Sequence, residues 1–295
     1  MTIELAALSL DPVSDWNQLT TYPFMVQALE AGTIVAVMAS VVGWLMVLRR
    51  QVFAGHTLAV IAFPGAAAAA LSGLPLAVGY YGFCSLGAGA LAAASRGEVR
   101  GRSSESAAIG TLQALALGAG FVFVGLYNGQ LGDLQAMLFG TFLGITAGQV
   151  LTLLWIAFGT LAILGVAARP LLFASVDPGV ARARGVPAKL LDAGFLLVLG
   201  VAVAATAQIT GALLVFALLV TPAATAQRLT ARPGAGIVLA AAFALVVTWL
   251  GLAAAYFSPY PVGFWVTSFS FGLYVIVRVL TAGGPMGRTH ATGAA

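Results

Sequence analysis

Long apolar runs constrain the fold of this chain more than any other feature. Stretches of about 20 apolar residues recur along nearly its whole length, and only 7% of the 295 residues are charged. A soluble domain needs far more charge to cover its surface. Because irregular backbone cannot face lipid, the runs must be helices, and the short alternating segments of a transmembrane barrel are not visible. The sequence therefore predicts an all-α, polytopic transmembrane helical bundle in the cell (inner) membrane.

Lysines and arginines divide the apolar runs, and their placement predicts the topology. Positive charge stays on the cytoplasmic side of a membrane. With about nine spans, the N-terminus outside and the C-terminus inside, every one of the thirteen Lys and Arg residues falls on the cytoplasmic side. The clusters are Arg49 and Arg50; Arg96, Arg100 and Arg102; Arg169, Arg182, Arg184 and Lys189; Arg228 and Arg232; and Arg278 with Arg288.

The predicted spans follow from these clusters. Two runs have basic residues on both flanks and must each cross twice, with turns at Ser72–Pro75 and at Gln208–Gly211. The run Met137–Ile145 is too short to span and is predicted to be interfacial or re-entrant. Residues 1–22 are expected to be extracytoplasmic, 23–281 to form the transmembrane domain and 282–295 a cytoplasmic tail. The spans are expected at about 24–48, 57–71, 75–94, 107–127, 147–168, two within 190–226, 234–256 and 263–280.

The most charged part of the chain is the segment Arg169–Asp192, which lies between two apolar runs. Asp177 suits the N-cap of a helix, Pro178 its first position and Gly185 a left-handed residue just after its end. Arg182 lies near the C-terminal end, where the helix dipole favours positive charge. These residues predict a helix of about two turns, which is too short to cross a bilayer. We expect it at the cytoplasmic face, within reach of a soluble partner.

Polar groups inside the apolar runs are the first candidates for function. Glu30 shares a helix face with Gln27, and it either lines a pathway or reaches the outer interface. His56 opens the second span, and its neutral imidazole can bind a transition metal. Ala59 and Val60 supply no second ligand on the same face, so His56 is either a metal ligand or a polar end group.

The seventh span contains Thr221, Pro222 and Thr225. Pro222 removes one backbone hydrogen bond and frees a carbonyl group, which threonine hydroxyls or a neighbouring helix can satisfy. The segment is therefore either a bent helix beside a pathway or a structural kink. Thr57 and Pro64 in the second span are further pathway candidates.

Motifs for catalysis and nucleotide binding are missing from the sequence. A phosphate-binding loop needs a lysine after glycine, and the single lysine, Lys189, follows Pro187 and Ala188. No serine-hydrolase motif, zinc-protease motif or pair of close carboxylates occurs within a span, so we predict no enzyme activity. The single cysteine, Cys84, excludes an internal disulfide and a cysteine-cluster metal site. The net charge of +4 comes from residues between the spans, which argues against a nucleic-acid partner.

Three blocks of sequence resemble the permease subunit of the zinc/manganese/iron ATP-binding-cassette importers. Their order and spacing fit along most of the chain, and the third block is long and highly specific. The blocks are Phe53–Leu58 followed by Phe63–Ala66; Asp177, Ala181 and Gly185 at intervals of four; and Gly211–Ala226.

This resemblance implies a subunit that moves transition-metal ions as a homodimer. Two cytoplasmic ATPase subunits, which bind ATP and magnesium, and an extracytoplasmic metal-binding protein would complete the transporter. The resemblance also implies that the helix at Asp177–Gly185 docks into a groove on the ATPase, with Ala181 and Arg182 among the coupling residues. No cofactor is expected in this chain itself.

One departure from the family concerns the metal pathway. The family typically has Asp at the position of His56 and His at the position of Val60, a pair thought to touch the passing metal. The alternatives are therefore a different or chelated metal or a vitamin, ligands from another span, or a loss of transport. A secondary transporter that uses Glu30, and a non-transporting scaffold, are readings from other classes.

Overall fold

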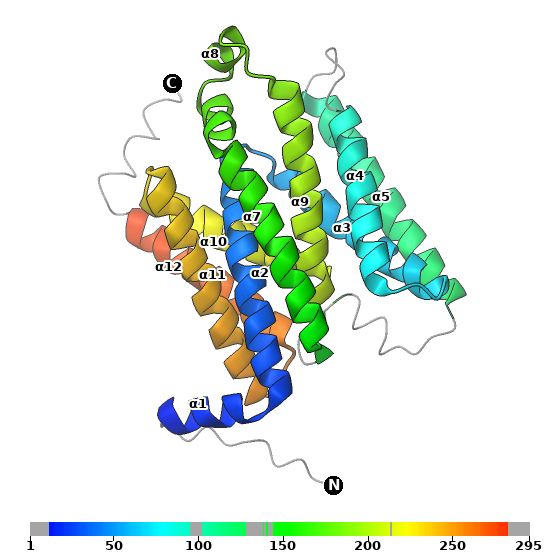
Figure 1. Cartoon of the computed structure of the whole chain (residues 1–295), viewed down its shortest axis with the longest axis vertical. Coiled ribbons are helices and arrows are strands. Elements are labelled where there is room, and N and C mark those ends of the chain that lie inside the picture. The colour runs from blue at the N-terminus through cyan, green and yellow to red at the C-terminus, as the bar shows by residue number, and fades with distance from the viewer. Residues whose placement is uncertain are drawn as a thin grey trace.

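The computed structural model is a bundle of helices (Figure 1). It describes residues 12–94, 102–127, 138, 140, 144–212 and 214–282. The helices within these residues are α1 (Pro12–Thr21), α2 (Pro23–Leu48), α3 (Val52–Leu71), α4 (Leu76–Ala94), α5 (Arg102–Leu126), α7 (Ala147–Val176), α8 (Pro178–Ala183), α9 (Ala188–Thr210), α10 (Val215–Leu229), α11 (Pro233–Tyr256) and α12 (Val262–Ala282).

The predicted all-α transmembrane bundle is confirmed. Eight of the described helices are long and apolar enough to cross a membrane, and α10, with 15 residues, is a shorter apolar helix. Together they occupy the positions of the predicted spans. The orientation of the two termini relative to the membrane stays a prediction.

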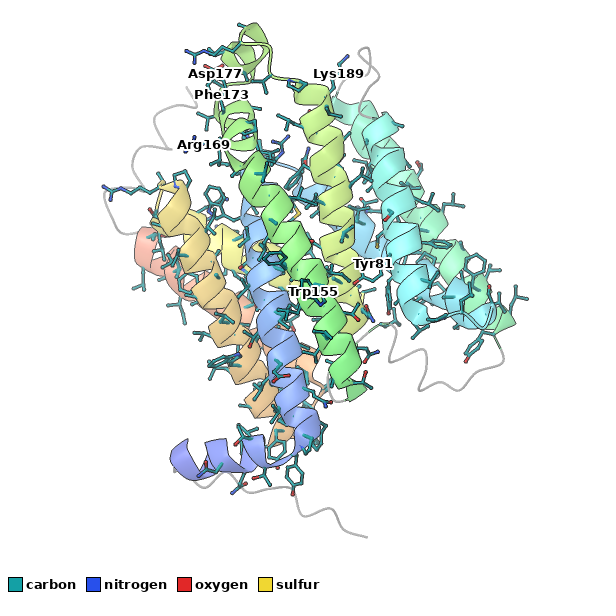
Figure 2. All side chains as sticks on the ribbon, viewed as in Figure 1. Tyr81, Trp155, Arg169, Phe173, Asp177 and Lys189 are labelled. Atoms are coloured by element: carbon teal, nitrogen blue, oxygen red, sulfur yellow. The ribbon has the colours of Figure 1, made fainter. Side chains whose placement is uncertain are left out.

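Some helix boundaries differ from those predicted. Helix α3 begins at Val52 rather than near Thr57, so His56 lies in its second turn. Helix α7 continues past Ala168 to Val176, and Pro170 lies inside it. The charge of Arg169 does not end the helix because this part of α7 lies at the end of the bundle, where an exposed charge is tolerated (Figure 2).

The sequence does not predict helix α1. It lies across the end of the bundle opposite α8 (Figure 1) and packs against α2. Its first residue, Pro12, suits the first position of a helix, where the missing N–H costs nothing. A short helix therefore lies at each end of the bundle, α1 at one end and α8 at the other.

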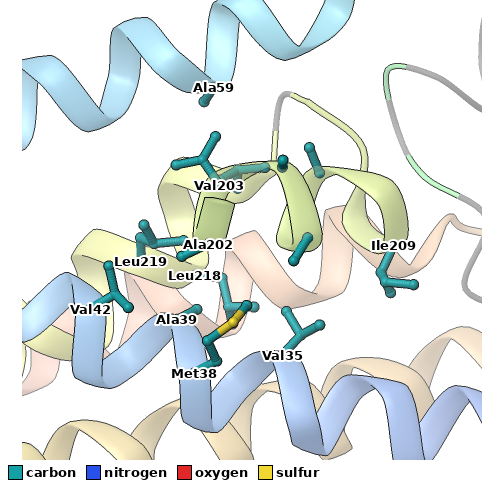
Figure 3. Close-up of a cluster of buried hydrophobic side chains, with 14 of the residues drawn as sticks. Val35, Met38, Ala39, Val42, Ala59, Ala202, Val203, Ile209, Leu218 and Leu219 are labelled. Atoms are coloured by element: carbon teal, nitrogen blue, oxygen red, sulfur yellow. The ribbon is translucent and has the colours of Figure 1, made fainter. Parts of the chain in front are cut away.

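Helix α2 lies at the centre of the bundle and packs against α7, α9, α10 and α11. Figure 3 shows apolar side chains of α2, α3, α9 and α10 meeting in the core. Close approach depends on glycine. A Cβ on Gly43 of α2 would collide with the backbone carbonyl of Leu219 in α10, and Gly65 and Gly79 face each other between α3 and α4 in the same way. Small residues let membrane helices pack this closely.

The chain between α9 and α10 turns within the bundle. Gly211, at the end of α9, has a φ of +76°, and Gly140 has a φ of +81°. A Cβ on either glycine would collide with the backbone beside the other. Irregular backbone at membrane depth is tolerated where protein covers it. The predicted interfacial or re-entrant segment, Met137–Ile145, lies largely outside the described residues.

Candidate functional site

The N-terminus of α8 is capped as the sequence predicts. The Asp177 carboxylate accepts hydrogen bonds from the backbone N–H groups of Gly179 (3.1 Å) and Val180 (2.9 Å). A helix cannot satisfy these first N–H groups internally. Figure 2 shows Asp177 near the tip of the hairpin that α7, α8 and α9 form.

The C-terminus of α8 is closed by the predicted glycine. Gly185 has a φ of +76°, and the Val186 N–H donates to the Ala181 carbonyl oxygen at 3.0 Å. This hydrogen bond is typical of a Schellman motif, and the left-handed conformation favours glycine. The two caps limit α8 to 6 residues.

Helix α8 presents only some of the predicted coupling residues to the outside. Asp177 is exposed, whereas Ala181 is completely buried (0% exposed) and packs inside the hairpin. The Arg184 guanidinium lies 5.8 Å from the centre of the Phe173 ring, which links the segment after α8 back to α7. Nothing is described for the side chain of Arg182. A partner could reach Asp177 directly, but it could not reach Ala181 without rearrangement of the hairpin.

An ion pair between a buried arginine and a half-exposed aspartate lies at the base of this hairpin and is not predicted by the sequence. The Arg49 side chain, at the end of α2, is 6% exposed and pairs with Asp192 of α9. It also donates to Ser175 Oγ (3.1 Å) and to the Leu171 carbonyl oxygen (3.4 Å) of α7, and it lies 5.1 Å from the centre of the Phe195 ring. Burial lowers the pKa of Arg49, and the Asp192 carboxylate opposes this effect. One side chain therefore joins three helices.

His56 of α3 faces Phe216 of α10. The two ring centres lie 5.0 Å apart with an angle of 72° between the ring planes, so one ring presents its edge to the other. His56 Nδ1 is buried and has no hydrogen-bond partner among the described residues. A ring nitrogen in this condition can accept a hydrogen bond or bind a metal ion.

The other pathway candidates of α3 are held within the protein. Thr57 Oγ1 donates to the Phe53 carbonyl oxygen (2.9 Å) and accepts from Gln113 Nε2 of α5 (2.9 Å). Pro64 is buried inside α3 and has no N–H for the Val60 carbonyl. Thr57 therefore joins α3 to α5, and its hydroxyl hydrogen is already used in a hydrogen bond.

The threonines of α10 satisfy a different carbonyl group from the one that Pro222 frees. Thr225 Oγ1 donates to the Thr221 carbonyl oxygen at 2.7 Å. Pro222 removes the hydrogen bond to the Leu218 carbonyl, four residues earlier. Pro222 and Thr225 are buried, and Thr221 is partly buried.

Glu30 lies apart from these residues, on the half of α2 nearer to α1, and its side chain is exposed. Asp192 is another carboxylate in a helix long and apolar enough to span the membrane, since α9 begins at Ala188 and contains Asp192 in its second turn. Among the described residues, no three His, Cys, Asp or Glu side chains lie close enough together to hold a metal ion.

Comparison with known proteins covers nearly all of this architecture. The model of the ABC 3 transport family matches residues 21–281, which include α2 through nearly all of α12. The chain belongs to this family. The resemblance found in the sequence is thereby confirmed.

Relatives within the ABC 3 transport family are similar over most of their length. The manganese transport system membrane protein MntC of Halalkalibacterium halodurans is 31% identical over 82% of this chain and 81% of the relative. The chelated iron transport system membrane protein YfeC of Yersinia pestis is 31% identical over 78% of this chain and 77% of the relative. The solved structure of PsaBC from Streptococcus pneumoniae in complex with Fab matches with a TM-score of 0.79 and 25% identity, over 90% of this chain and 94% of that one.

Membership in the ABC 3 transport family assigns the chain to the permeases of ATP-binding-cassette transporters. It is a multi-pass protein of the cell membrane and not an enzyme. The α8 hairpin and the contact between α3 and α10 are therefore parts of a permease.

Proposed function

We propose that this chain is the membrane-spanning permease subunit of an ATP-driven importer for transition-metal ions, with manganese, iron or zinc as the substrate. The observation that carries the proposal is the family match over residues 21–281. Relatives named for manganese and chelated iron support the substrate class. Because the sequence has no phosphate-binding loop, a separate ATPase subunit would bind ATP and magnesium.

In this proposal, α8 is the element that receives force from the ATPase. It is short, capped at both ends and packed mainly against α7 and α9. The basic residues Arg169, Arg184 and Lys189 flank it, which favours a cytoplasmic position. The segment Asp177–Gly185 would dock into a groove on the ATPase, and a push there would be passed to the two long helices that hold it.

The transporter would contain two copies of this chain, two ATPase subunits and an extracytoplasmic metal-binding protein. The contact between α3 and α10 supports the homodimer. His56 and Phe216 are only partly buried, and Phe53 is 50% exposed. A second copy placed over this contact would enclose it and complete a pathway.

A permease for a metal chelate is the second candidate. Val60 stands where the family typically has a histidine, and His56 faces the Phe216 ring rather than a second ligand. An apolar, aromatic lining suits a chelate that brings its own ligands, whereas a bare ion needs protein ligands.

Uptake by right-side-out vesicles tests both candidates. The vesicles contain the chain with its ATPase, are loaded with ATP, and are supplied on the outside with the metal-binding protein. We expect uptake of radioactive Mn²⁺ that requires ATP and is lost when the ATPase cannot hydrolyse it. Competition with free iron, free zinc and chelated iron ranks the substrates. Uptake that continues without ATP would contradict the proposal.

A further inference from the structure

The buried arginine at the base of the α8 hairpin grips both of its arms. Ser175, which accepts from Arg49, lies two residues before the α8 cap at Asp177. Asp192, the ion-pair partner, lies one turn into α9. Arg49 itself follows directly after α2. Its contacts thus lie close to α8 on both sides of the hairpin.

The burial of Arg49 is costly unless several groups compensate for it. Moving a guanidinium out of water is unfavourable unless close partners compensate for the lost hydration. Here the partners are a carboxylate, a hydroxyl, a backbone carbonyl and an aromatic face. An apolar residue could fill the same space without this penalty. The Asp192 side chain is 46% exposed, so only the arginine of this pair is removed from water. A buried arginine of this kind is weak evidence of a stabilising role and better evidence of a device that fixes one arrangement.

The same contacts lie on the route from α8 to the centre of the bundle. Helix α8 packs mainly against α7 and α9. Movement of α8 must therefore pass through these two helices to reach α2, which in turn packs against α10 and α11. Apolar contacts along α2 can slide, whereas an ion pair with directed hydrogen bonds holds one register.

We infer that Arg49 is a positioning residue that locks α7, α9 and α2 into one unit, so that displacement of α8 moves the central helix. This inference rests on the proposed function, because it takes α8 as the site where the ATPase acts. Arg49 touches neither substrate nor ATPase in this role. It acts through Ser175 and Asp192, and its loss leaves α8 with its own caps intact.

Coupling in the assembled transporter tests the inference. The chain with its ATPase is placed in proteoliposomes with the extracytoplasmic metal-binding protein, and Mn²⁺ uptake and ATP hydrolysis are measured together. Arg49→Gln should lower the Mn²⁺ transported per ATP by about tenfold, within the range over which changes along a coupling network act. Retention of the ATPase on the purified chain should not change, because the exposed face of α8 is untouched.

Arg50→Gln is the matched control. It removes the same charge one residue further along, from an exposed side chain without an ion pair among the described residues. Its transport ratio should stay within about twofold of wild type, since exposed charges contribute little. An equal loss in both variants would mean that charge at this end of the membrane matters, and it would overturn the inference.

Two further variants keep the test decisive if Arg49→Gln folds poorly. Ser175→Ala removes one of the two hydrogen bonds from Arg49 to α7 and should lower the transport ratio by about two- to threefold, as expected for one lost hydrogen bond. Arg49→Asp with Asp192→Arg exchanges the two charges and should recover much of the ratio lost in Arg49→Asp alone. Folding of each variant is followed by its melting temperature in detergent.

The outcomes separate this inference from the proposed function. If the wild-type chain retains no ATPase and takes up no Mn²⁺ or chelate with ATP, the proposed function fails. If wild type transports and Arg49→Gln keeps its ratio at a normal melting temperature, the positioning role alone fails. A low melting temperature with an unchanged ratio in the molecules that fold would also contradict it, because Arg49 would then be structural.

Discussion

The α7–α8–α9 hairpin and the contact between α3 and α10 are built in opposite ways. The hairpin depends on charge and directed hydrogen bonds, with Asp177 at the cap of α8 and Arg49 paired with Asp192 at its base. The contact between α3 and α10 has one imidazole, His56, against an aromatic ring, Phe216. The hairpin, which is proposed to receive force, is held in one geometry by directed interactions. The contact between α3 and α10, which is proposed to meet cargo, is not. In the proposed function, residues at the cargo contact can therefore change without altering the hairpin.

The largest effect is expected at the cap of α8. Asp177→Arg removes the carboxylate that accepts from Gly179 and Val180, and it places positive charge at the positive end of the helix. ATP-dependent uptake in vesicles should fall by about tenfold, since loss of such a cap costs about 1 kcal/mol and the unfavourable charge adds about 0.5 kcal/mol. The amount of chain inserted in the membrane should not change.

Asp177→Asn is the control for this variant, because asparagine caps helices about as well as aspartate. It should retain most of the uptake. If Asp177→Arg transports normally, the hairpin is not the coupling element. The hairpin and the contact between α3 and α10 would then not differ in function as proposed.

The next effect concerns packing beside the contact between α3 and α10. Gly43→Val places a side chain against the backbone carbonyl of Leu219, which cannot move aside as a flexible side chain would. Overpacking of this kind costs about 1–3 kcal/mol. The melting temperature in detergent should fall by several degrees, more than for any single polar change in this region.

Gly82→Ala in α4 is the matched control, because a Cβ there meets nothing within 4 Å. It should leave the melting temperature unchanged or raise it slightly, since alanine favours helices. A similar fall in both variants would show that small residues matter for helix flexibility rather than for close approach.

A smaller and opposite effect is expected at the cargo contact. His56→Asp with Val60→His restores the pair typical of the family, one helical turn apart on one face of α3. Carboxylate and imidazole together suit Mn²⁺ better than one imidazole. Uptake of free Mn²⁺ should rise by about threefold relative to uptake of chelated metal.

Val60→Leu is the control for that double variant, because it changes the packing without adding a ligand. No change in the ratio of free to chelated uptake would place the cargo ligands on another helix. ATP hydrolysis should stay the same in all these variants, which separates the cargo contact from the hairpin.

Local signals in the sequence predict much of the hairpin. Asp177 and Gly185 are recognisable as caps because capping depends on neighbours in sequence. The spans are equally local, since each is an apolar run bounded by charged or turn-forming residues. The Arg49–Asp192 pair is not predictable in this way, because its members are 143 residues apart. The one available signal is Asp192, an acid at the start of an apolar run. An acid there needs a partner, but the sequence does not show which residue that partner is.

Contacts between helices account for the other surprises. Ala181 was expected to face a partner, yet α8 turns it inward, and six residues have too little periodicity to reveal which face is buried. Thr57 was a pathway candidate, yet it bonds Gln113 of another helix. A single sequence shows that a polar group lies within a span, but not whether another helix satisfies it.

The smallest effect is expected at Thr57. Thr57→Val leaves the Gln113 amide without its acceptor and should lower stability by about 0.5–1 kcal/mol, the usual range for one hydrogen bond between membrane helices. Adding Gln113→Leu should recover part of that loss, because replacing both partners with apolar groups is nearly neutral. Uptake should stay within about twofold in both variants, as measured beside the melting temperature. If Thr57→Val instead abolished uptake at normal stability, the Thr57 hydroxyl would belong to the pathway. The cargo region would then depend on directed hydrogen bonds, as the α7–α8–α9 hairpin does, and the contrast between the two regions would fail.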